Sequence, residues 1–199
     1  MEHQRGDFSR NNRILFLSAI ASLVGIAAAF VAKGLLLLIA LFTNIFYFGE
    51  FTFVSRAPSM EHWGVAFILV PAVGSLIIGL MARYGSEKIR GHGIPEAIEA
   101  ILFGKSIMQP KVAVLKPLSS AISIGSGGPY GAEGPIIMTG GAVGSLTAQF
   151  LHVTSAERKT LLVAGAAAGM SAVFATPIAA VLLAIELLLF ELKPRSVVP

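Results

Sequence analysis

The stretch that decides the fold is Gly125-Ser-Gly-Gly-Pro-Tyr-Gly-Ala-Glu-Gly-Pro-Ile-Ile-Met-Thr-Gly-Gly-Ala-Val-Gly144. It places one carboxylate, Glu133, in a glycine-rich turn just ahead of Pro135, a residue that can open a helix. The surrounding sequence is strongly apolar, and a lone acid at membrane depth is costly enough to indicate a functional site. A helix start is also where backbone N–H groups and the positive end of the dipole hold an anion. The stretch therefore predicts an anion site with a competing carboxylate built into it.

The composition is that of an integral membrane protein. Of the 199 residues, 55% are hydrophobic and 13% charged, and the mean hydropathy is +0.78, whereas a soluble domain carries about a quarter charged residues. Cysteine is absent and the four histidines are scattered, so we expect no metal site and no cofactor. The net charge of +4 lies largely near the ends of apolar runs, which favours lipid headgroups over nucleic acid as partners.

Two long apolar runs open the chain. After a polar lead at residues 1–13, residues 14–48 are almost unbroken apolar sequence and would span about 52 Å as a helix. Since that exceeds the roughly 30 Å hydrocarbon core, we expect a helix that is strongly tilted or projects beyond the core, with Lys33 snorkelling or facing protein. Residues 63–82 form a second span. Basic residues cluster before the first run and after the second, which predicts a cytoplasmic amino terminus.

The later apolar runs are short and interrupted by glycine and proline. They cover residues 93–103, 112–124, 135–151 and 161–190, the last broken at Pro177. Broken helices at membrane depth are tolerated only where protein or a watery cavity covers them, and transporters aim such half-helices at a substrate. We therefore expect an all-α membrane protein of tilted and broken helices.

Two other interpretations of the glycine-rich stretch, a nucleotide-binding loop and an intramembrane serine protease, are disfavoured. A phosphate-binding loop needs Gly-Lys-Ser/Thr at its end, but Ala132 and Glu133 follow Gly131. A serine protease could use Ser126 with His92 or His152, yet nothing in the sequence pairs serine with histidine. We expect no enzyme.

Other motifs have structural interpretations. Glu96 follows Gly-Ile-Pro95 in the first turn of a short helix, where an acid favours the dipole, so we expect a capping role. The spacings Gly140/Gly144 and Gly165/Gly169 indicate close helix packing. Two interpretations of Glu186 are left open: it lies near the aqueous interface, or it forms part of a polar path for protons or ions.

Three segments together resemble the CLC family of chloride channels and chloride/proton antiporters. They are Gly91-His-Gly-Ile-Pro-Glu96, Gly131-Ala-Glu-Gly-Pro135, and Gly165-Ala-Ala-Ala-Gly169 with Phe174, Pro177 and Glu186. Their order and spacing match the family across roughly residues 14–192.

The resemblance implies a function. In that family, half-helix N-termini converge on chloride near the midplane, inside each subunit of a homodimer, and a glutamate gates the path. Carried over, Glu133 is the gate. The candidate anion-binding groups are the imidazole of His92 and the backbone amides of Gly93, Ile94, Gly134 and Ile136. Transport should depend on pH, because protonation of the gate removes its charge.

Departures from the family pattern refine this expectation. His92 stands where the family has a pore serine, and Ala132 replaces an arginine beside the gate. Leu187 occupies the position of the antiporters' internal proton-transfer glutamate, with Glu186 matching the acid just before it. Because leucine cannot relay a proton, we expect passive or uncoupled chloride transport.

The length suggests part of a larger membrane domain. The resemblance implies that residues 14–199 form the first of two inverted repeats in a multi-pass protein of a prokaryotic plasma membrane. The alternatives are a chloride/proton antiporter, a fluoride exporter, and a truncated, non-conducting fragment with a scaffold or assembly role.

Overall fold

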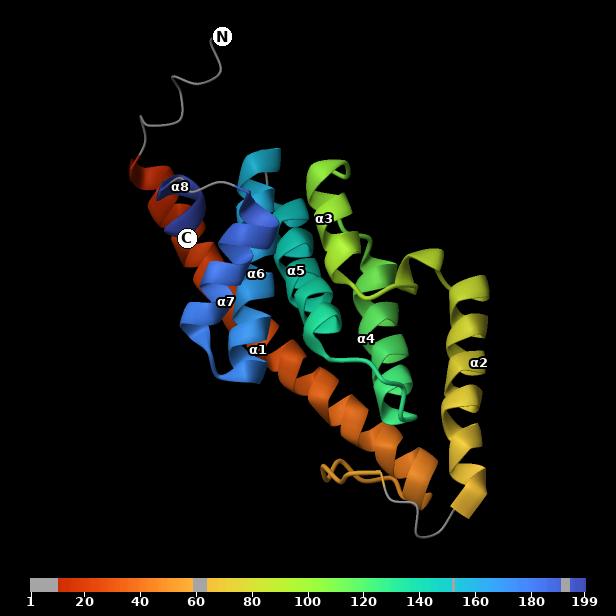
Figure 1. Ribbon diagram of the computed structural model, residues 1–199. Helices are drawn as coiled ribbons and strands as arrows, with labels where there is room; N and C mark the ends of the chain where they lie inside the picture. Colours follow the sequence, from red (N-terminus) through yellow and green to blue (C-terminus); the bar gives the residue numbers. More distant parts are fainter. Residues whose placement is uncertain (1–10, 59–63, 152, 191–193) are drawn as a thin grey trace.

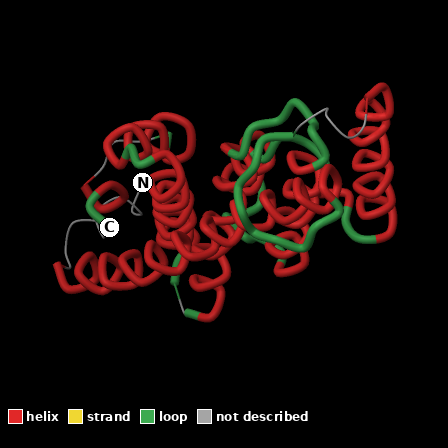
Figure 2. Tube along the Cα trace, turned by 90° about the horizontal axis from the view of Figure 1, so that it is seen from below, coloured by secondary structure: helices red, strands yellow, loops and turns green. Residues whose placement is uncertain are grey.

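The computed structural model describes residues 11–58, 64–151, 153–190 and 194–199, and these residues form helices joined by loops, with no strand among them (Figure 1, Figure 2). The helices are α1 (Asn11–Phe48), η2 (Gly64–Ile68), α2 (Leu69–Tyr84), η3 (Glu87–Ile89), α3 (Ile94–Leu102), α4 (Pro110–Gly125), α5 (Glu133–Phe150), α6 (Ser155–Phe174), α7 (Pro177–Ala184), the π-helical η4 (Ile185–Leu189) and α8 (Pro194–Val197). The all-α architecture expected from the sequence is confirmed.

Helix α1 runs diagonally along the molecule, and α4, α5 and α6 pack against it (Figure 1). Within the described ranges it alone is long and apolar enough to cross a membrane unaided. The second span is helical over residues 64–84, because η2 continues directly into α2, and the predicted start at residue 63 lies outside the described residues. One long helix followed by short ones agrees with the expected pattern of broken helices.

The helix break predicted at Pro177 is present. Helix α6 ends at Phe174, Ala175 adopts a left-handed conformation with φ 53°, and α7 begins at Pro177. Proline is well placed at a first helical position, because its missing N–H would have no partner there.

Helices α5 and α6 make the closest packing in the bundle. A Cβ on Gly140 would lie 2.4 Å from the carbonyl oxygen of Gly165, and one on Gly144 would lie 2.0 Å from that of Leu161. No side chain fits at those distances, so the two backbones touch through glycine. The packing role predicted for these glycines is confirmed, and α5 is buried along most of its first half.

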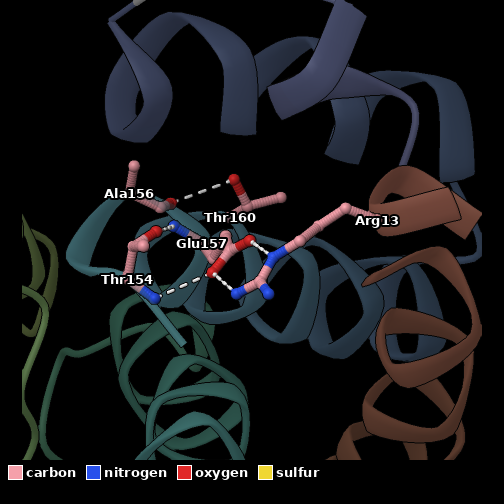
Figure 3. Close-up of polar contacts among 5 residues, drawn as sticks. All are labelled: Arg13, Thr154, Ala156, Glu157 and Thr160. Carbon is pink, nitrogen blue, oxygen red and sulfur yellow. Dashed lines mark hydrogen bonds and ion pairs between the residues drawn. The ribbon is translucent and has the colours of Figure 1, made fainter. Parts of the chain in front are cut away.

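An ion pair joins the start of α1 to the start of α6. The Arg13 guanidinium donates through Nε and Nη2 to the Glu157 carboxylate, and the Nη2 bond measures 2.8 Å (Figure 3). The same carboxylate accepts from the Thr154 N–H at 2.8 Å, while the Thr154 hydroxyl accepts from the Glu157 N–H at 3.3 Å. This is a capping box. Residues 11–13, expected to belong to the polar lead, therefore form the first turn of α1.

Candidate anion site

The first half of the site is the start of α3. Gly93 precedes the helix with φ 115°, and Pro95 occupies its second position. The Glu96 carboxylate reaches back and accepts a hydrogen bond from the Gly93 N–H at 2.7 Å. The capping role expected of Glu96 is confirmed. As a consequence the Gly93 amide, expected to bind an anion, is engaged by Glu96 in this structure.

The second half is the start of α5. The helix begins at Glu133 itself, two residues before Pro135. The Ile136 N–H donates to the Ala132 carbonyl at 3.0 Å, which is the first bond of the helix. The assignment of Ile136 as an anion donor is therefore corrected. Helix geometry leaves the amides of Glu133 and Gly134 without an intrahelical acceptor, and Pro135 has no N–H.

The two helix starts meet at Gly93 and Gly134. A Cβ on Gly134 would lie 2.0 Å from the His92 carbonyl oxygen, and one on Gly93 would lie 2.5 Å from the Gly134 carbonyl oxygen. Both glycines are buried. Because every helix carries partial positive charge at its N-terminus, this contact brings two such ends together. An anion is favoured where they meet.

The side chains of His92 and Glu133 lie on the open side of this junction. Both are exposed on the surface of the chain, while the backbones of Gly93 and Gly134 beneath them are buried. Ile94, at the first position of α3, is half-buried. The structure thus brings His92, Gly93 and Ile94 together with Gly134, and it leaves the Glu133 side chain exposed beside them.

A buried lysine supports the junction from behind. Lys116 of α4 is 2% exposed, and its Nζ donates to the carbonyl oxygens of Ile89 at 3.0 Å and Gly91 at 2.8 Å. These carbonyls belong to the segment that leads into α3, so the lysine holds that segment while adding positive charge near the helix starts. Lys116 was not among the site residues predicted from the sequence. The signal that singled out Lys33, a lysine within apolar sequence, applied to it as well.

An open pocket of about 470 Å³ adjoins the junction. Its wall combines apolar side chains with serines, and His92, Gly131 and Pro135 form part of it. The serines that line it come from α2 and α4: Ser75, Ser119, Ser120 and Ser123. Hydroxyl groups can donate to anions or water, and of these four the Ser119 hydroxyl already donates to the Lys116 carbonyl at 3.0 Å.

Glu186 belongs to a different element from these residues. It is exposed on η4, a turn that packs against α3 and α6. Its neighbour Leu187 packs against the main hydrophobic core. The structure therefore shows an apolar side chain at the position where the resemblance places a proton-transfer acid.

The described residues do not assemble the disfavoured enzyme sites. The Ser126 hydroxyl donates to the Ser123 carbonyl at 3.1 Å, and Ser126 is 1% exposed, so it is not presented to a substrate. His152 lies outside the described residues. Among the residues searched, no three His, Asp or Glu side chains gather as a metal site would require.

The sequence matches that of a known protein family. The sequence model of the voltage gated chloride channel family matches residues 73–199, which include both helix starts and the glycine-rich stretch. The chain belongs to the voltage gated chloride channel family. Its members are integral membrane proteins, so the contact between α3 and α5 lies in a membrane domain.

Individual relatives in this chloride channel family come from bacteria. A protein named as ClcB-like from Ralstonia nicotianae is 32% identical over 150 residues, which cover 73% of this chain and 34% of that protein. The H⁺/Cl⁻ exchange transporters ClcA of Citrobacter koseri and Klebsiella pneumoniae are each 34% identical over 134 residues, covering 67% of this chain and 27% of theirs. The chain thus spans about a third of the length of these curated relatives, or less.

Proposed function

We propose that this chain forms one wall of a chloride pathway across a membrane, with Glu133 as its gate. The observation that carries the proposal is the backbone contact of the α3 and α5 starts at Gly93 and Gly134, with Glu133 in the first position of α5. Two helix ends favour negative charge at one place, and membrane transporters use half-helices in this way.

Gating follows from competition between two anions. An ionised Glu133 carboxylate and a chloride ion are both attracted to the amides at the start of α5. When the carboxylate occupies that position, chloride is excluded, and when it is protonated or rotates outward, chloride can enter. The exposed position of Glu133 leaves its side chain room for such a rotation.

The amides of Ile94 and Gly134, with the His92 imidazole, are the donors we favour, since the Gly93 and Ile136 amides already donate to Glu96 and Ala132. The ammonium of Lys116 adds a positive charge behind them. It needs no direct contact with the ion, because electrostatic attraction is strong where water is scarce.

We propose that transport is passive or uncoupled from protons. The apolar packing of Leu187 supports this, since that side chain can neither bind nor release a proton. Chloride/proton exchange is the second candidate, because two relatives are named H⁺/Cl⁻ exchange transporters and the exposed acid Glu186 lies one residue away.

The proposed setting is the plasma membrane of a prokaryote. The chain would have a cytoplasmic amino terminus and lie in contact with lipid. A homodimer is the proposed assembly, and neither a cofactor nor a chemical reaction is needed, since the ion crosses unchanged.

Chloride efflux from proteoliposomes tests the proposal. Two preparations are compared with protein-free vesicles: this chain alone, and a chimera in which the chain replaces the aligned 150 residues of the Ralstonia relative. We expect efflux from the chimera, altered by substitution of Glu133. A monodisperse, folded chimera without efflux would argue for the scaffold alternative, and a constant proton-to-chloride ratio would argue for exchange.

A further inference from the structure

Tyr47 makes a buried hydrogen bond far from its own place in the sequence. It lies one residue before the end of α1 and is 2% exposed, and its hydroxyl donates to the Ser126 carbonyl at 2.8 Å. Ser126 follows the last residue of α4, where helix geometry leaves carbonyl groups without partners. The tyrosine therefore satisfies the carbonyl at which the chain leaves α4 and enters the loop to α5.

That loop carries the gate. Gly127 has φ 87°, and the N–H of Gly128 donates to the Ser123 carbonyl at 3.0 Å, which closes the end of α4. The loop then runs through Tyr130 to Glu133, the first residue of α5. A Cβ on Gly127 would lie 2.3 Å from the Tyr47 hydroxyl. A residue larger than glycine at position 127 would therefore clash with the Tyr47 hydroxyl.

Helix α2 and the η2 turn before it pack around the contact between Tyr47 and Ser126. The rings of Tyr47 and Phe67 lie 5.0 Å apart between centroids, and a Cβ on Gly74 would lie 2.1 Å from the Ser126 hydroxyl. Three parts of the fold thus meet where the gate loop begins: the end of α1, the η2–α2 segment, and the end of α4. The opposite end of the loop is anchored by the Gly134 contact with residue 92.

We propose that Tyr47 is a positioning residue for Glu133. Its hydroxyl anchors the start of the 126–132 loop, which limits the directions in which the carboxylate can turn away from the start of α5. This inference rests on the proposed gating function. Its structural part, that the hydroxyl holds the loop, can be tested without any transport measurement.

Hydrogen exchange followed by mass spectrometry tests the anchor on the full chain in detergent. Tyr47→Phe removes the hydroxyl and keeps the ring against Phe67. Loss of one buried hydrogen bond should speed exchange in peptides covering residues 126–134 by roughly two- to tenfold, with peptides from α6 unchanged. The matched control is Tyr84→Phe, at an exposed tyrosine of α2. Equal exchange in the two variants, or a uniform rise across the bundle, would overturn the proposal.

A second variant tests whether the Tyr47 hydroxyl is in direct contact with residue 127. Gly127→Ala should lower the melting temperature more in the presence of Tyr47 than in the Tyr47→Phe protein, because the added Cβ meets the hydroxyl oxygen. Additive effects of the two substitutions would contradict the direct contact.

Chloride efflux from the chimera tests the effect on the gate. Tyr47→Phe should shift the pH dependence of efflux when residue 133 is glutamate and leave it unchanged after Glu133→Gln. If Glu133→Gln by itself has no effect on the pH profile, the proposed gating function fails, while the exchange experiment still decides whether Tyr47 holds the loop. A Tyr47→Phe shift of equal size in both backgrounds would overturn the positioning role alone.

Discussion

Gly93 and Gly134 lie in backbone contact, and neither position has room for a side chain. Gly93 ends the turn before α3, and Gly134 is the second residue of α5, so the contact joins two helix starts that are 41 positions apart in sequence. The Glu133 side chain is exposed beside it. The proposed anion site depends on that contact, because it brings two positive helix ends to one place.

Neutralising the gate should open the path. Glu133→Gln removes the competing charge while keeping the shape of the side chain. A carboxylate at a helix N-terminus is stabilised by about 0.3–2 kcal/mol, so its removal should raise chloride efflux from the chimera by roughly two- to thirtyfold and flatten its pH profile. Glu99→Gln, at an exposed acid near the other end of α3, is the control. An unchanged pH profile would remove Glu133 from the gating role.

Adding one methyl group at the junction should damage the fold. Gly134→Ala places a Cβ against the His92 backbone, which cannot move as a flexible side chain could. We expect a loss of about 1–3 kcal/mol in the free energy of unfolding, measured by denaturant titration in detergent. Gly79→Ala in α2 is the matched control, since nothing lies within 4 Å of its Cβ. It should be neutral or stabilising by up to about 1 kcal/mol. Equal effects would show that the junction is looser than described.

Removing the buried ammonium should loosen the segment before α3. Lys116→Met leaves the carbonyls of Ile89 and Gly91 without their donor, at an expected cost of about 1–3 kcal/mol. It should also reduce the rise in melting temperature when chloride replaces a bulky organic anion in the buffer. Lys111→Met, at an exposed lysine of the same helix, should change neither quantity appreciably. A chloride-dependent stabilisation that survives Lys116→Met would separate this charge from anion binding.

Chloride should move without a fixed number of protons. With the apolar Leu187 packed against the core, we expect efflux of chloride from the chimera to leave the internal pH unchanged once the membrane potential is clamped. A pH-sensitive dye and a chloride electrode record both movements in the same vesicles. Proton movement abolished by Glu186→Gln would instead favour exchange, with Glu186 as the inner proton acceptor.

Local sequence chemistry was sufficient to predict most helix boundaries. Pro177 marked the break before α7, and the Gly-Ile-Pro-Glu96 run marked the start of α3, because proline and a capping acid act within one helical turn. The second span, predicted from residue 63, is helical from Gly64, but its first turn is 3₁₀ and the α-helix begins only at Leu69. Apolar sequence shows where a helix can lie in lipid, but it does not show where regular hydrogen bonding begins.

The sequence by itself determined that this is an all-α membrane protein, and that Glu133 stands in a glycine-rich turn at a helix start. Both follow from composition and from interactions between residues a few positions apart. Only the tertiary structure decided that the starts of α3 and α5 meet at Gly93 and Gly134, because that contact joins positions 41 residues apart. It also decided that Lys116 and Tyr47 support the site, since each acts on backbone carbonyls 25 or more positions away, and a single sequence carries no record of such distances.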